Sequence, residues 1–245
     1  MPRLLDRRET AAELGTDRYL GAYFDARAGG IHPLNYALGL ATGLAASGVA
    51  IHEDCPVTGP GGRRGEGLVD MPARNGSRRS RSSSRPTPIR TWRPCHPRCT
   101  ARVVPVASSA IVTEPMPDAV SSTVMPTGRL ASDTKRIMHY FRRLPDGRFF
   151  LGGRGDLQGR DRLESFQELE RGVTMLFPQL TGVKTAFRWS GKVAVTLDDF
   201  PHLGRVGSNI LFAMGYGGRG VALTNLLGKY VAPDGDGATR STPGR

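Results

Sequence analysis

The chain has 245 residues and a formal net charge of +12, and 38% of its residues are apolar. It is long enough to bury a core, as one large domain or as two small ones. Its three cysteines are too few for a disulfide scaffold, and no apolar run approaches the ~18 residues of a membrane helix. The N-terminus lacks the apolar stretch of a signal peptide. We therefore expect a cytoplasmic protein without a membrane partner.

The positive charge is concentrated in one segment. Between Pro60 and Arg102 the chain has eleven arginines, one Glu, one Asp and no lysine, so this segment supplies +9 of the +12. It contains a single aromatic residue, Trp92, whereas single-stranded nucleic acids are bound through a series of aromatic side chains. We therefore expect no nucleic-acid partner. A non-enzymatic basic binding protein with a disordered Arg-rich arm stays open as the alternative to an enzyme.

The N-terminal part has the pattern of a folded domain. Residues 34–47 show the apolar spacing of a helix. Pro33 suits the first turn of that helix, and Gly48 suits the position just after its end. The next five residues, VAIHE, predict a short strand.

Residues 102–191 have the pattern of several strands and one helix. RVVPVASSAIVTEP is strand-like with an internal proline, which predicts an edge strand. RIMHYFRRLPDGRFFLGG predicts a hairpin that turns at Pro-Asp-Gly, and VKTAFRWSG predicts a further strand. Between them we expect a helix that Pro178 ends, with one apolar stripe formed by Leu163, Phe166, Leu169, Val173 and Leu176.

The C-terminal part contains a glycine-rich turn. NILFAMG predicts an apolar strand, and GYGGRGVALTNLLGKYVA predicts a turn that runs into a helix. Glycines in such a turn let a ligand approach the backbone, and the start of the helix offers unpaired N–H groups to an anion or a carbonyl. The alternative is a tight strand-to-helix turn that binds nothing.

Three segments in their order carry a family resemblance. They are GAYFDARAGGIHPLNYALGLATGLAASGVAIHEDCPVTG, YFRRLPDGRFFLGGR and TLDDFPHLGRVGSNILFAMGYGGRGV. Together they resemble the FAD-dependent oxidoreductases of the D-amino-acid oxidase type, and most of all the gamma-glutamylputrescine oxidase-like branch, which oxidises amines. The resemblance covers about residues 10–59 and 101–230.

The resemblance implies an α+β / α/β fold, made of an incomplete FAD-binding Rossmann-like domain and an antiparallel-sheet substrate domain. Residues 1–59 are then a partial FAD-binding domain, and residues 60–100 a disordered segment. Residues 101–195 form the substrate domain, residues 196–230 return to the FAD-binding domain, and residues 231–245 are a disordered tail.

The resemblance also implies which residues bind FAD. A GG-x-HP turn precedes a helix of the flavin domain, the backbone of a valine touches the adenine end, and a T-x-D run passes beside the flavin ring. The glycine-rich turn lies against the isoalloxazine, where helix amides stabilise negative charge on the reduced flavin. The implied cofactor-binding residues are Gly29, Gly30, Val57, Thr196, Asp198, Gly215, Tyr216, Gly217, Gly218, Arg219, Gly220 and Val221.

The implied reaction is the oxidation of a C–N bond by hydride transfer to flavin, with O₂ as the acceptor. The substrate is a small amine or amino acid, and because the cofactor does the chemistry no catalytic residue is assigned. The run GKVAVTLDD lacks the Arg-Pro that grips a carboxylate in amino-acid oxidases of this type, which favours an amine. We expect no metal, since the pair Cys95 and Cys99 is half of a zinc site.

Two departures from the family pattern lead us to expect that the chain as written is inactive. First, no G-x-G-x-x-G unit follows an apolar strand near the N-terminus, so the chain looks truncated there. That unit holds the FAD pyrophosphate, and FAD affinity should collapse without it.

The second departure is residues 60–100, where the resemblance implies a strand like VVLATNAYTD. When the codons of residues 82–93 are displaced by one base, codon degeneracy admits VVLATNAYTDLA in that place. Our hypothesis is that residues 60–100 are translated from the wrong frame between two compensating shifts, and that the tail is a similar case. The DNA sequence tests it.

Overall fold

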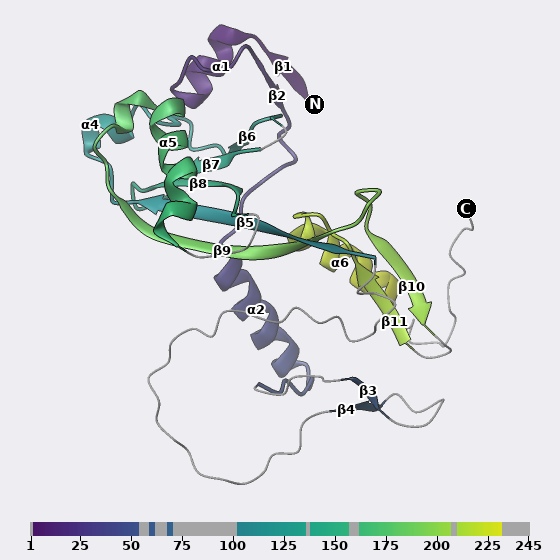
Figure 1. The fold of residues 1–245 in the computed structure, drawn as a ribbon. Helices are drawn as coiled ribbons and strands as arrows, with labels where there is room; N and C mark the ends of the chain where they lie inside the picture. Colours follow the sequence, from purple (N-terminus) through teal and green to yellow (C-terminus); the bar gives the residue numbers. More distant parts are fainter. Residues whose placement is uncertain are drawn as a thin grey trace, which may run out of the picture. The chain divides into compact units, whose positions relative to one another are not determined.

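A computed structural model describes residues 2–53, 59–61, 68–70, 102–135, 138–156, 162–206 and 210–231 (Figure 1). Val57, residues 82–93 of the frame-shift hypothesis, Cys95 and Cys99 lie outside the described residues. The chain packs into two compact units. The first unit is Met1–Leu40 with Val106–Lys192, and the second unit is Ala41–Pro105 with Val193–Arg245.

A five-stranded sheet in the order β6-β7-β8-β5-β9 is the centre of the first unit. The predicted hairpin is confirmed, because β7 and β8 pair antiparallel around a turn in which Gly147 has a φ of +77°. β5 pairs antiparallel with β8, and β6 with β7. The strands are β5 (Val104–Thr113), β6 (Ala131–Ser132), β7 (Tyr140–Arg143), β8 (Phe149–Arg154) and β9 (Thr185–Val195).

The prediction that β5 is an edge strand is wrong. β5 lies between β8 and β9. Its pairing with β8 runs from Ser108 to Val112, so Pro105 lies before the paired residues. A proline there removes no hydrogen bond from the ladder between β5 and β8, and a strand with an internal proline can therefore be central.

The helix α5 (Gln167–Leu176) covers one face of this sheet (Figure 1). The predicted apolar stripe is confirmed for four of its five residues, which are buried, whereas Leu163 is 70% exposed. Leu163 is the first residue of the 3₁₀ helix η1 (Leu163–Phe166), which precedes α5 and whose last residue, Phe166, is buried. The α-helix ends before Pro178, as predicted, and η2 (Pro178–Leu180) follows.

The N-terminal segment adds a small layer that the sequence patterns did not predict. β1 (Arg3–Leu5) pairs antiparallel with β2 (Ala22–Phe24), and α1 (Arg7–Leu14) lies between them in the chain. A capping box starts α1, since Asp6 accepts the Glu9 N–H and the Glu9 side chain accepts the Asp6 N–H. A short helix, α4 (Asp118–Ser121), follows β5.

The predicted helix after Pro33 is confirmed as α2 (Pro33–Ala46). Gly48 ends it with a φ of +84°, and the N–H groups of Gly48 and Val49 bond back to Ala45 and Leu44. The predicted strand VAIHE is wrong, because residues 49–53 form no strand. A strand needs a neighbour to pair with, and Val49 and Ile51 are both exposed.

Among its described residues, the second unit has two antiparallel strand pairs, the end of α2 and one further helix. β10 (His202–Val206) pairs with β11 (Ile210–Met214), and β3 (Gly59–Gly61) pairs with β4 (Leu68–Asp70). The predicted strand and helix around the glycine-rich turn are confirmed as β11 and α6 (Gly220–Val231). Helices mixed with antiparallel sheets make the fold α+β. None of the helices in the described ranges has the length and apolar character to span a bilayer.

Candidate functional site

The T-x-D run forms a tight turn between β9 and β10. Thr196 is only 5% exposed, and its hydroxyl donates to the carbonyl of Phe200 over 2.8 Å. The Asp198 carboxylate accepts the Phe200 N–H at 3.2 Å and lies 3.1 Å from the His202 ring nitrogen. Asp199 completes the turn with a φ of +59°. The turn is therefore fixed by its own side chains.

The charge on Asp198 is stabilised by these contacts. Its hydrogen bond with His202, and then those with the Phe200 N–H and the Thr196 hydroxyl, lower the pKa of Asp198 to about 2. The Asp198 side chain is exposed, so solvent screens the effect. Asp198 is thus an ionised turn residue at neutral pH and has no proton to give.

The glycine-rich turn packs against the T-x-D turn. Gly215 has a φ of +77°, and a Cβ at this position would overlap the Cγ2 of Thr196. The N–H of Gly217 donates to the carbonyl of Ala194 over 3.1 Å. Arg219 joins the two turns, because its guanidinium donates to the Asp199 carbonyl at 2.7 Å. The two predicted cofactor segments of the second unit therefore form one structure.

The other side of the glycine-rich turn is open. Gly218 has a φ of +85°, and among the described residues, its two chain neighbours aside, no atom lies within 4 Å of the position of its missing Cβ. Within the described part of the chain, the N–H groups of Gly220, Val221 and Ala222 make no backbone hydrogen bond, and the first N–H bonded inside the helix is that of Leu223. These three N–H groups carry the positive end of the α6 dipole.

The pattern G-x-G-x-x-G is present in this turn. Gly215, Gly217 and Gly220 have its spacing, between β11 and α6. β11 pairs antiparallel with β10, whereas the phosphate-binding fingerprint belongs to a parallel βαβ unit.

The remaining predicted residues lie in several places. Gly29 and Gly30 belong to the first unit, between β2 and α2, and line a cleft of about 820 Å³. His32 accepts the Asn35 N–H over 3.2 Å, at the start of α2. Tyr216 is half-buried and Val221 is exposed. The roles of all these residues in FAD binding stay predictions.

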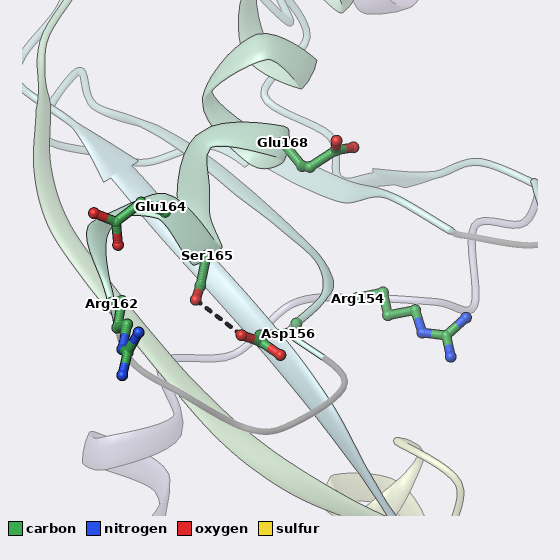
Figure 2. Close-up of a pocket in the computed structure, with 7 residues that line it drawn as sticks. Arg154, Asp156, Arg162, Glu164, Ser165 and Glu168 are labelled. Atoms are coloured by element: carbon green, nitrogen blue, oxygen red, sulfur yellow. Dashed lines mark hydrogen bonds between the residues drawn. The ribbon is translucent and has the colours of Figure 1, made fainter.

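A smaller hollow of about 380 Å³ lies in the first unit beside η1 (Figure 2). Figure 2 shows the Ser165 hydroxyl directed at Asp156, to which it donates over 3.3 Å. The other charged side chains of the lining have both signs, and they are Arg154, Arg162, Glu164 and Glu168. Such a mixed, polar surface does not favour one class of ligand.

Comparison with known proteins identifies the family of this chain. The model of the family described as FAD dependent oxidoreductase matches residues 1–233, and the chain belongs to this family. Among solved structures, L-proline dehydrogenase from P. horikoshii has a TM-score of 0.70 at 19% identity, over 94% of this chain and 63% of that one. Glycine oxidase from Geobacillus kaustophilus has a TM-score of 0.68 at 17% identity, over 94% and 61%.

Two curated relatives are closer in sequence. The probable oxidoreductase OrdL of Haemophilus influenzae is 33% identical over 242 residues, which are 94% of this chain and 53% of the relative. The gamma-glutamylputrescine oxidoreductase of Escherichia coli is 29% identical over 233 residues, again 94% and 53%. The chain therefore spans about half the length of the curated relatives that it matches.

Proposed function

We propose that this protein takes part in the oxidation of a C–N bond of a small amine or amino acid, with FAD as hydride acceptor and O₂ as final oxidant. The substrate loses a hydride from carbon and a proton from nitrogen, and water then hydrolyses the imine. The observation that carries the proposal is the open glycine-rich turn at the start of α6, in a chain of the FAD dependent oxidoreductase family.

The residues present fit the flavin-ring end of FAD. Gly218 leaves open space beside the turn, and the N–H groups of Gly220, Val221 and Ala222 offer three donors on one side. Donors at a helix N-terminus suit an electron-rich carbonyl and the negative charge of a reduced flavin. When FAD is bound, its ring supplies the redox chemistry of the reaction.

The neighbouring side chains hold this turn in place. Arg219 is paired with Asp199, at 3.6 Å between Nη2 and Oδ1, and Asp198 is paired with His202. Gly215 allows the turn to lie against Thr196. We infer that these residues position the N–H groups and exchange no proton with the substrate.

We infer further that this chain binds the flavin ring but gains little from the pyrophosphate. Riboflavin, FMN and FAD should then bind with similar, weak affinities, which quenching of flavin fluorescence measures on the purified chain. Tighter binding of FAD by a factor of about 100 would place the pyrophosphate on α6 and contradict this inference. If none of the three flavins binds and DNA binds with a steep salt dependence, the protein is a basic binding protein instead.

The reaction itself is tested on a fusion. The part of the Haemophilus relative that the match leaves uncovered is joined to this chain, and the relative's matching segment replaces residues 60–100. We expect the fusion to retain yellow FAD, and an amine added without O₂ to bleach it, while this chain alone shows no bleaching. A yellow fusion that neither amines nor amino acids bleach would refute the proposed reaction.

A further inference from the structure

The cleft of about 820 Å³ in the first unit has the dimensions of a small-molecule site. It lies between the N-terminal segment and the edge of the sheet, and residues of α1, β2, β6 and β7 line it. Its apolar wall includes Leu5, Leu14 and Phe141, and Phe141 stacks on Tyr19 with ring centroids 6.2 Å apart.

Four residues of this cleft have side-chain oxygens without a hydrogen-bond partner. Thr10 and Asp133 are 0% and 7% exposed as whole residues. Leaving such a group unsatisfied is unfavourable, and native structures contain few of them. The four atoms are Thr10 Oγ1, Glu13 Oε2, Tyr19 OH and Asp133 Oδ2, and each is shielded from water and unbonded within the part of the chain that the structure describes.

The nearest cations satisfy these carboxylates only in part. Glu13 Oε1 pairs with Arg129 at 2.5 Å, and the Arg129 guanidinium also lies 4.4 Å over the Phe24 ring, which leaves Glu13 Oε2 without a donor. Asp25 also lines the cleft, but Arg27 binds its carboxylate at 2.7 Å.

Asp133, like Glu13, has one carboxylate oxygen without a hydrogen bond. Its Oδ1 accepts the backbone N–H of His139 at 2.9 Å. Its Oδ2 lies 3.4 Å from Lys135 Nζ and 3.5 Å from His139 Nδ1, longer than the roughly 2.7–2.9 Å of a charge-assisted hydrogen bond. One oxygen of this buried carboxylate therefore accepts a hydrogen bond, whereas the other has only these two longer ion-pair contacts.

The chemistry of the four oxygens defines the missing ligand. Ionised carboxylates only accept hydrogen bonds, and hydroxyls both accept and donate. Burial, and then the charge of Asp133, raise the pKa of Tyr19, so its phenol keeps its proton. The lining has three carboxylates, of Glu13, Asp25 and Asp133, against one guanidinium, of Arg129, and it has an apolar wall. It therefore suits a group that brings several N–H donors and a positive charge.

We propose that this cleft binds the ammonium group of a primary alkylamine, with Glu13, Asp133, Tyr19 and Thr10 around the nitrogen and the alkyl chain against Leu14 and Phe141. The protonated nitrogen supplies three N–H donors. Because the four oxygens are shielded in the ligand-free chain, the proposal requires their side chains to rotate toward the nitrogen when the amine binds. The site lies within the first unit and does not depend on flavin binding.

Three probes of similar size test the site on the full chain. n-Butylammonium has the charge and the N–H donors, n-butyltrimethylammonium has the charge alone, and butan-1-ol has neither. We expect n-butylammonium to raise the melting temperature at constant ionic strength, and to bind about tenfold more tightly than the other two by calorimetry. Equal effects of all three probes would show that no donor-specific site exists.

Two conservative variants locate the site. Tyr19→Phe keeps the ring on Phe141, and Asp133→Asn keeps the carbonyl oxygen for the His139 N–H. Both should abolish the shift caused by n-butylammonium. The matched controls Tyr140→Phe and Asp118→Asn lie outside the cleft lining and should leave that shift unchanged.

The melting temperatures of the variants without any added amine distinguish a ligand site from a structural role of Tyr19. Tyr140 OH lies 3.1 Å from the Ser108 hydroxyl, so Tyr140→Phe removes a satisfied hydrogen bond and should lower the melting temperature. Tyr19→Phe removes an unsatisfied hydroxyl and should keep or raise it. If Tyr19→Phe destabilises the free protein as Tyr140→Phe does, or if both cleft variants still respond to n-butylammonium, the proposal is refuted.

Discussion

Gly215 and Thr196 fit together so closely that a Cβ on Gly215 would overlap the Cγ2 of Thr196. Gly215→Ala should therefore destabilise the second unit by about 1–3 kcal/mol, from the overlap and from the φ of +77°. Thr196→Ser removes the Cγ2 and keeps the hydroxyl that bonds to Phe200. Denaturant unfolding of both single variants and the double variant should show partial rescue, and strictly additive losses would contradict this packing.

Gly152 lies as close to an aromatic ring as Gly215 lies to Thr196. A Cβ on Gly152 would overlap the ring of Tyr140 on the adjacent strand β7. We expect Gly152→Ala to displace the ring and destabilise the protein by about 1–3 kcal/mol. Gly191→Ala is the control, because no atom of another described residue beyond its chain neighbours lies within 4 Å of its Cβ position. In the background Tyr140→Ala, the change at Gly152 should be nearly neutral, and an unchanged loss there would disprove the contact.

The capping box of α1 gives a third prediction. Asp6→Ala leaves the Glu9 N–H without its acceptor and should destabilise the first unit by about 1 kcal/mol. Asp6→Ser retains an acceptor and should be nearly neutral. Thermal unfolding of the two variants measures the difference, and equal melting temperatures would show that the cap contributes nothing.

Asp198 makes the free energy of unfolding depend on pH in the acid range. Its folded pKa of about 2 is below the unfolded value of about 3.9, so its stabilising contribution is complete above the unfolded value and is lost as pH falls toward 2. The difference in unfolding free energy between the wild type and Asp198→Asn should therefore shrink from pH 5 to pH 2. A difference that is constant over this range would show that the carboxylate is unperturbed.

The sequence patterns predicted the elements that a local apolar period or a local turn specifies. The four buried residues of the stripe, from η1 and α5, belong to one buried cluster. The hairpin at Gly147 and the cap at Gly48 follow from the positive φ that each turn requires. The patterns failed where the outcome depends on neighbours. Pro105 indicated an edge strand because the register of β5 is not visible locally, and VAIHE has a strand composition without a pairing strand.

The candidate site was predicted from motifs and not from geometry. Motif order placed Thr196, Asp198 and the glycine-rich turn in one site, and the structure joins them through Gly215 and Arg219. No sequence motif marks the residues that carry the unpartnered oxygens of the cleft. Thr10, Glu13 and Asp133 look like ordinary surface residues in the sequence, and only tertiary packing buries them.

The central claim is that the start of α6 binds a flavin ring, and a substitution at Gly218 tests it most directly. Gly218→Asn tolerates the positive φ and fills the open space, and Gly228→Asn makes the same change in the middle of α6, where the Cβ position is also open. We predict that Gly218→Asn weakens riboflavin binding about tenfold or more, and that Gly228→Asn binds as the wild type does. If both variants bind riboflavin as the wild type does, or if the wild type binds none, the glycine-rich turn is not a flavin site.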